Sequence, residues 1–191
     1  MSNIIKSPTH LSMYILKEYI EPGDILIDAT CGNGKDTLYL AMLKPSKLYA
    51  FDIQEEAIDT TRKLLMSQGY AGKLEDGTIS LLQTSHINIP FYVKRGIKAI
   101  VFNLGYRPGG DKSITTSAEN TVKAVKFCLN LLQNDGIICI TMYSGHQEGT
   151  VEKDLLLTYT KGLDPTLYHV AYFNMLNQPN HPPEILFITK K

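Results

Sequence analysis

The sequence contains little cysteine and no long hydrophobic run. Its three cysteines, Cys31, Cys128 and Cys139, have no spacing typical of a zinc site, and an odd number cannot form a complete set of disulfides. No run approaches the roughly 20 apolar residues that a membrane-spanning helix needs, and the N-terminus lacks the apolar core of a signal peptide. These absences predict a protein of the reducing cytoplasm with no membrane partner.

The sequence also lacks an excess of either charge. It has 19 Lys and Arg against 19 Asp and Glu, so the formal net charge is zero. This balance argues against a protein that coats nucleic acid non-specifically, but it leaves room for a local basic patch. The basic residues nearest to the motifs described below are Lys6, Lys35, Arg107 and Lys112. Another basic cluster is expected to be solvated surface: Lys94, Arg95 and Lys98.

Strand-like and helix-like segments alternate along the chain, and the last two strand-like segments follow each other without a helix. Alternation predicts a doubly wound parallel sheet, and the final pair predicts a hairpin. We therefore expect one domain, residues 1–191, with an α/β fold. Its Rossmann-like, seven-stranded sheet is mostly parallel, with one antiparallel strand from the C-terminal hairpin. The expected strands are Ile25–Asp28, Leu48–Ile53, Thr78–Gln83, Lys98–Leu104, Ile137–Tyr143, Leu167–Phe173 and Glu184–Lys190. The expected connections include a loop at 69–77 and a turn at 134–136.

The first strand runs into a small, polar turn, Asp28-Ala-Thr-Cys-Gly-Asn-Gly34. In an open α/β sheet such a turn is the usual place for a ligand. Two ligands compete, a dinucleotide and S-adenosylmethionine (SAM). The dinucleotide fingerprint G-x-G-x-x-G fails because Thr37 stands where the third glycine belongs. A carboxylate at Asp28 is poorly placed for a pyrophosphate and well placed for the ammonium of a methionine group, so the turn favours SAM.

The same residues resemble the first motif of class I SAM-dependent methyltransferases, an acidic residue followed by three alternating glycines. Thr30 replaces the first of these glycines. The resemblance implies that the turn holds the methionine part of SAM, that Asp52 binds the ribose hydroxyls and that Gln54 flanks the adenosine. It also implies an adenine pocket at Ser85 and His86. The cofactor-binding residues expected from it are Asp28, Thr30, Cys31, Gly32, Asn33, Gly34, Asp52, Gln54, Ser85, His86 and Asn103.

A second motif follows the fourth strand. Asn103-Leu-Gly-Tyr106 is similar to the Asn-Pro-Pro-Tyr tetrapeptide of amino-group methyltransferases. An amine nucleophile needs acceptors for its N–H groups, which Asn103 can supply, and Tyr106 can stack on a base. SAM is already activated by its positive sulfur, so positioning can supply most of the catalysis. An aliphatic amine must also lose a proton, and Asp111, Tyr143 and His146 are alternative acceptors.

Three segments, DATCGNGKDT, FNLGYRPGGDK and YSGHQEG, together resemble a bacterial family known as rRNA methylases. A member of that family methylates the aminomethyl group of 5-aminomethyl-2-thiouridine at the tRNA wobble position. The resemblance implies that activity here, with the anticodon region of tRNA as substrate. The residues alone leave four alternatives open: methylation of an rRNA base, methylation of a small amine, a non-catalytic SAM- or nucleotide-binding module, and a nicotinamide dehydrogenase. The oligomeric state is also open and includes a homodimer.

Overall fold

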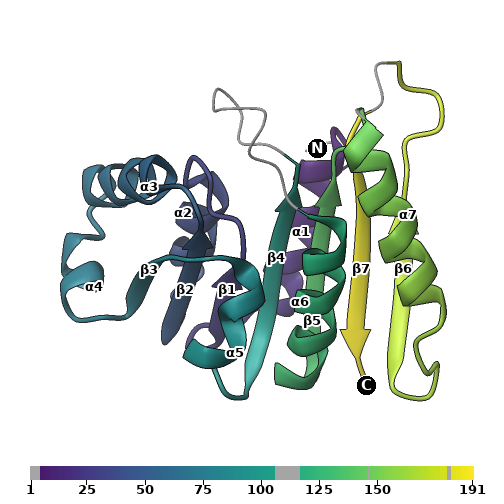
Figure 1. Cartoon of the computed structure of the whole chain (residues 1–191). Coiled ribbons are helices and arrows are strands. Elements are labelled where there is room, and N and C mark those ends of the chain that lie inside the picture. Colours follow the sequence, from purple (N-terminus) through teal and green to yellow (C-terminus); the bar gives the residue numbers. More distant parts are fainter. Residues whose placement is uncertain (1–4, 106–116, 146, 180–181) are drawn as a thin grey trace.

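Seven strands form one sheet in the computed structural model, which describes residues 5–105, 117–145, 147–179 and 182–191. Their order in the sheet is β3-β2-β1-β4-β5-β7-β6 (Figure 1). β7 pairs antiparallel with both of its neighbours, and the other pairings are parallel. The predicted fold class, with one antiparallel strand, is confirmed. The strands are β1 (Ile25–Asp28), β2 (Lys47–Asp52), β3 (Ile79–Gln83), β4 (Ile97–Leu104), β5 (Leu132–Met142), β6 (Tyr168–Phe173) and β7 (Glu184–Lys190).

Helices cover both faces of this sheet (Figure 1). Successive residues of a strand point to opposite faces, so the apolar strands feed two cores. In β4, Ala99 and Val101 pack with α1, α2 and α3, whereas Ile100 and Phe102 pack with α5, α6 and α7. The helices are α1 (Pro8–Tyr19), α2 (Lys35–Met42), α3 (Glu55–Ser67), α4 (Ala71–Glu75), the short 3₁₀ helix η1 (His86–Asn88), α5 (Ile89–Tyr92), α6 (Ala118–Leu131) and α7 (Gln147–Lys161). In the described part of the chain, no helix combines the length and apolarity needed to cross a membrane.

The strand order reverses at β1, which pairs with β2 on one side and β4 on the other. Asp28 at the end of β1 lies level with Ala50 of β2 and Val101 of β4. The two neighbouring strands therefore extend beyond β1, and their next outward residues include Asp52 and Asn103. A reversal of this kind leaves a crevice at the carboxyl ends of the strands, where α/β proteins bind ligands.

Two connections differ from the sequence-based prediction. The loop expected at 69–77 contains the short helix α4. The turn expected at 134–136 lies inside β5, where Asp135 has a positive φ of 58° and the register with β4 shifts. The strand is irregular at these residues but does not end there: Leu132 before the turn pairs with Ile97 of β4, and Ile137 after it pairs with Ala99.

Gly136 is required by this bend. A Cβ built there would lie 2.9 Å from the carbonyl oxygen of Gln133 and 3.0 Å from that of Ile97. We expect Gly136→Ala to lower the free energy of unfolding by about 1–3 kcal/mol, because backbone must move to accept the methyl group. Urea denaturation measures this change. Gly72→Ala in α4 is the control: an added Cβ meets no atom within 4 Å, so the variant should be as stable as the parent or more so. Equal stability of the two variants would contradict the packing argument.

Candidate functional site

The turn between β1 and α2 is closed by a buried carboxylate. Asp28 has no exposed surface. Its oxygens accept hydrogen bonds from the backbone N–H of Thr30 at 3.2 Å and from the hydroxyl of Thr37, in the first turn of α2, at 2.6 Å. Burial, with a smaller contribution from the negative charge of Asp36, raises the pKa of Asp28 to about 7. Asp28 therefore stabilises the turn through buried hydrogen bonds. This differs from the expected direct pairing with a ligand ammonium, which needs a side chain that reaches the surface.

The backbone after Asp28 is tied to the strands on both sides. The N–H of Ala29 donates to the carbonyl of Val101 in β4, and the N–H of Cys31 donates to the carbonyl of Phe51 in β2, both at 2.8 Å. These bonds hold the loop over the ends of two parallel strands, at the point where the strand order reverses.

The two glycines of the loop have different roles. Both have positive φ, 51° at Gly32 and 80° at Gly34. A Cβ on Gly34 would lie 2.9 Å from the Cα of Thr61, so this glycine allows α3 to pack against the loop. A Cβ on Gly32 would meet nothing closer than the carbonyl oxygen of Thr30 at 4.0 Å. Gly32 thus presents bare backbone on an open side of the loop, as a ligand cradle requires.

Asp52 supports the same loop from β2. Its carboxylate accepts the N–H of Gly32 at 2.9 Å and the N–H of Gln54 at 3.0 Å. Asp52 and Gln54 are both half-buried, so each still has surface to offer a ligand. A carboxylate fixed by two backbone N–H groups is preorganised to accept further hydrogen bonds from paired hydroxyl groups.

The remaining loop residues are placed as expected for a small-residue turn. Asn33 is half-buried, whereas Cys31 is 4% exposed. Burial and the neighbouring Asp28 raise the pKa of the Cys31 thiol well above its usual range. Cys31 is therefore an inert packing residue within the loop.

His86 is less accessible than a pocket-lining residue would be. Its side chain is 8% exposed and packs edge-on against Phe102, with ring centroids 5.8 Å apart. Burial lowers its pKa to about 4, so the imidazole is neutral at physiological pH. Ser85 is half-buried and caps η1 by accepting the N–H of Ile87 at 3.4 Å. Of the two residues expected at an adenine pocket, Ser85 is the more exposed.

Asn103 joins three elements at the end of β4. Its backbone N–H donates to the hydroxyl of Thr30 at 2.7 Å, and its side-chain Nδ2 donates to Oδ2 of Asp36 at 2.7 Å. The first bond explains why a threonine stands in place of the first glycine, since its hydroxyl ties the loop to β4. The second bond fixes the side-chain amide, leaving Oδ1 as its hydrogen-bond acceptor.

Asp36 is a further candidate site residue, which the sequence alone did not indicate. It lies in the first turn of α2, where a carboxylate is favoured by the helix dipole. Burial raises its pKa, and the hydrogen bond from Asn103 acts in the opposite direction. Its presence directly after a ligand loop was the only signal in the sequence, because its bond to Asn103 spans 67 residues.

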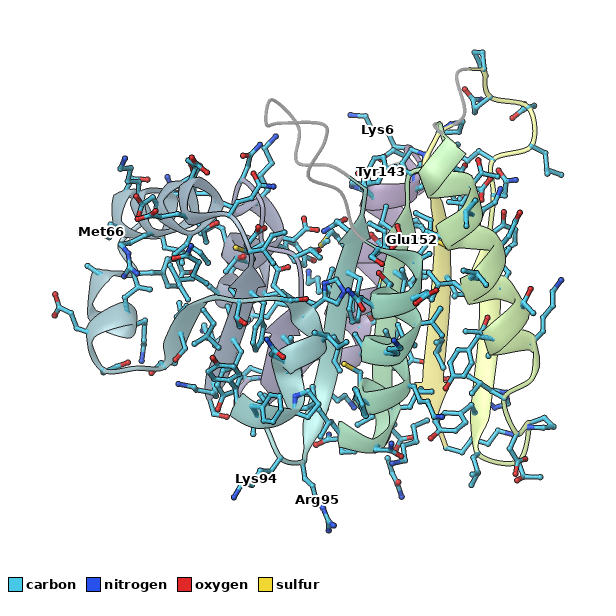
Figure 2. The ribbon with its side chains drawn as sticks, viewed as in Figure 1. Lys6, Met66, Lys94, Arg95, Tyr143 and Glu152 are labelled. Atoms are coloured by element: carbon cyan, nitrogen blue, oxygen red, sulfur yellow. The ribbon has the colours of Figure 1, made fainter. Side chains whose placement is uncertain are left out.

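Tyr143 follows β5 at the same end of the sheet, whereas Lys94 and Arg95 lie at the opposite end (Figure 2). The Tyr143 side chain is 42% exposed, and the partial burial of its phenol and the charge of Asp36 raise the pKa of that group. A phenol with a raised pKa stays protonated at neutral pH, so Tyr143 is a poor choice for the proton acceptor. Three other expected site residues, Tyr106, Asp111 and His146, lie outside the described residues.

The comparisons with known proteins identify the family. A family model described as "Putative rRNA methylase" matches residues 48–189. The chain belongs to this family. The family match begins in β2, and it therefore includes Asp52 and Asn103.

Several relatives of this rRNA methylase family member are similar to it over nearly its whole length. A chloroplast tRNA (mnm5s2U34)-methyltransferase of Arabidopsis thaliana is 34% identical over 197 residues, covering 97% of this chain and 70% of that protein. A crystal structure from Clostridium thermocellum, described as a "putative rRNA-methylase", is 37% identical, with a TM-score of 0.91 and coverage of 97% and 98%. A "putative methyltransferase" of Streptococcus mutans, solved in complex with SAH, is 36% identical, with a TM-score of 0.86 and coverage of 97% and 99%.

The buried Asp28 predicts a specific pH dependence of stability. With its pKa raised from 3.8 to about 7, the folded protein keeps a proton that the unfolded chain releases between these pH values. This contribution is complete below pH 3.8 and is lost as the pH rises to about 7. The side chain of Asp28→Asn stays neutral at every pH. Between these pH values we therefore expect the free energy of unfolding to fall less in the variant than in the parent, and the difference between the two falls should be at most about 4 kcal/mol.

Urea denaturation at a series of pH values measures the effect. Asp59→Asn, at an exposed position of α3, is the control and should keep the pH dependence of the parent protein. The same slope in Asp28→Asn and in the parent would show that the buried carboxyl does not hold the extra proton.

Proposed function

We propose that this protein is a cytoplasmic, single-domain, SAM-dependent N-methyltransferase. Its proposed substrate is the aminomethyl group of 5-aminomethyl-2-thiouridine at the wobble position of tRNA. The observation that carries the proposal is the fixed amide of Asn103, whose Nδ2 is held by Asp36 next to the ligand loop. The Arabidopsis relative, a tRNA (mnm5s2U34)-methyltransferase, supports a modified uridine at position 34 as the substrate.

The loop residues fit SAM. Gly32 offers open backbone, and the half-buried carboxylate of Asp52 is held by two N–H groups. We assign Asp52 to the ribose hydroxyls, Gln54 and Ser85 to the adenosine, and the loop of residues 29–34 to the methionine part. The Streptococcus mutans relative binds SAH, the product of methyl transfer from SAM, which supports this cofactor. SAM supplies an electrophilic methyl group on a positive sulfur.

Asn103 provides the acceptor for the incoming amine. Because its Nδ2 donates to Asp36, the amide presents Oδ1 for an N–H of the substrate. An amine held by one N–H has its lone pair aimed in a fixed direction, and positioning of this kind can supply most of the rate when the donor is already activated. A non-catalytic binding module has no need of such an acceptor beside the loop.

The tRNA is the proposed partner, with the anticodon region as the part bound. The basic residues Lys6 and Lys35 are exposed and belong to the segments that precede α1 and begin α2. We assign them to the phosphates near the modified base. A homodimer remains a prediction, and the edge strand β6 offers it exposed apolar side chains at Val170 and Tyr172.

Removal of the Asp52 carboxylate tests the cofactor site. Asp52→Ala loses a charged acceptor, so we expect the Kd for SAM to rise about 10- to 100-fold. Isothermal titration calorimetry measures it, with Asp59→Ala on the exposed side of α3 as the matched control. An unchanged Kd for SAM in Asp52→Ala would contradict the assignment of Asp52 to the ribose hydroxyls.

A methyl-transfer assay with mass spectrometry of nucleosides tests the whole proposal. The acceptors are tRNA that carries 5-aminomethyl-2-thiouridine, tRNA without it, and rRNA from cells that lack this protein. We expect a methyl group only on the aminomethyl nucleoside, and we expect Asn103→Ala to lower kcat about 100-fold through misplacement of the amine. Asn130→Ala, exposed near the end of α6, is the control. Methylation of rRNA alone, or of nothing despite tight SAM binding, would refute the tRNA proposal.

A further inference from the structure

The carboxylate of Asp36 lies beside the proposed amine acceptor. Its Oδ2 accepts Nδ2 of Asn103 at 2.7 Å, which links α2 to the end of β4. The backbone N–H of Asn103 is itself held by the hydroxyl of Thr30 at 2.7 Å. Both the amide and the carboxylate are therefore fixed relative to the ligand loop. An amine bound at Oδ1 of Asn103 is therefore separated from the Asp36 carboxylate by the amide group of Asn103 alone.

Among the residues that the structure describes, no cation contacts the carboxylate of Asp36. The titratable groups that influence it or respond to it are Asp28 of β1, Cys139 of β5, Tyr143 after β5 and the adjacent Lys35. Only Lys35 is positive, and among the described residues no ion pair within 4.0 Å involves Asp36. A half-buried carboxylate is costly when its hydrogen-bond donor is neutral, as the amide of Asn103 is, and a cation bound next to it offsets that cost.

We propose that Asp36 is the counter-ion and proton acceptor for a protonated primary amine, and that it makes the site selective for aliphatic ammonium groups over the neutral amino groups of nucleobases. This inference rests on the proposed function and deepens it by naming the group that recognises the substrate. An aliphatic amine is protonated at neutral pH and is drawn to a carboxylate. The amino group of a nucleobase is conjugated with its ring and uncharged, so it gains nothing from Asp36.

The proton and electron balance is simple. The ammonium transfers one proton to the carboxylate of Asp36, which leaves a neutral amine and a carboxylic acid. The nitrogen lone pair then forms the N–C bond while the bond between methyl carbon and sulfur breaks, and that electron pair stays on sulfur. The products are a secondary ammonium and SAH, and Asp36 releases its proton to solvent. A raised pKa of Asp36 narrows the gap to the pKa of the amine, which favours the transfer.

Asp36→Asn isolates the charge because its side-chain oxygen still accepts the bond from Asn103. The assay is methyl transfer to tRNA with 5-aminomethyl-2-thiouridine, between about pH 6 and pH 9. We expect kcat/KM near neutral pH to fall about 100- to 1,000-fold. We also expect the variant's kcat/KM to rise about tenfold per pH unit until the amine loses its own proton, more steeply than in the parent. A purely structural defect would lower activity equally at every pH.

Binding gives a second readout that does not depend on turnover. Anticodon-arm RNA with 5-aminomethyl-2-thiouridine is compared with the same RNA carrying 5-methyl-2-thiouridine, which lacks the amine. The parent and the control Asp59→Asn should prefer the aminomethyl RNA, and Asp36→Asn should bind both RNAs equally. Unchanged binding of SAM by Asp36→Asn shows that its fold is kept.

The outcomes separate the two proposals. A parent protein that methylates no aminomethyl RNA refutes the proposed function. A parent that does so, together with an Asp36→Asn variant that keeps its rate, pH profile and RNA preference, overturns only the role of Asp36. If Asp36→Asn does not fold, Asp36→Glu keeps the charge and should retain both the preference and the pH profile. Loss of the preference in a folded, SAM-binding Asp36→Glu variant would also overturn the inference.

Discussion

The buried hydrogen bond between Asp28 and Thr37 is the constraint on which the rest of the site depends. It joins the last residue of β1 to the first turn of α2 at 2.6 Å, with both side chains fully buried. The bond sets where α2 begins, and so it sets the position of Asp36 one residue earlier. It also closes the loop in between, which then lies over β2 and β4. Burial of a carboxylate is costly. The two hydrogen bonds that Asp28 accepts offset part of this cost, and the remaining cost appears as its raised pKa.

From this turn the site is assembled by side chains that each join two elements. Asp52 holds Gly32 from β2, Thr30 holds the backbone of Asn103 in β4, and Asp36 holds the side chain of Asn103. The ligand loop and the proposed amine acceptor are therefore parts of one hydrogen-bonded unit rather than neighbouring sites. This coupling explains why the loop tolerates threonine in place of the first glycine of the methyltransferase motif. A glycine at this position would give the backbone more conformational freedom, whereas the Thr30 hydroxyl accepts a hydrogen bond from the backbone of Asn103 and so ties the loop to β4.

The sequence predicted the sheet because its strand signals are local. Apolar, β-branched runs ended by turn residues indicate parallel strands, and the final pair without a helix indicates the antiparallel strand. The positions of Asp52 and Asn103 followed, since the carboxyl ends of parallel strands meet at one edge. The burial of Asp28 and His86 did not follow, because it depends on packing against Thr37 and Phe102 from other elements. Asp36 was missed for the same reason, since only the folded chain brings it to Asn103.

The charges around the site bear on how a neutral protein selects an RNA base. The carboxylates of Asp36 and Asp52, at this end of the sheet, repel phosphate at short range. The basic pair Lys94 and Arg95 lies at the far end of the sheet, away from Tyr143 (Figure 2). Attraction of RNA phosphates to Lys6 and Lys35 therefore acts around the pocket and not inside it. A cationic modification on the base reverses the sign of the local interaction, so the same carboxylates that disfavour phosphate favour an ammonium. For the proposed substrate, selection then comes from the modified group rather than from the length of contact with RNA, which is consistent with a small domain of zero net charge.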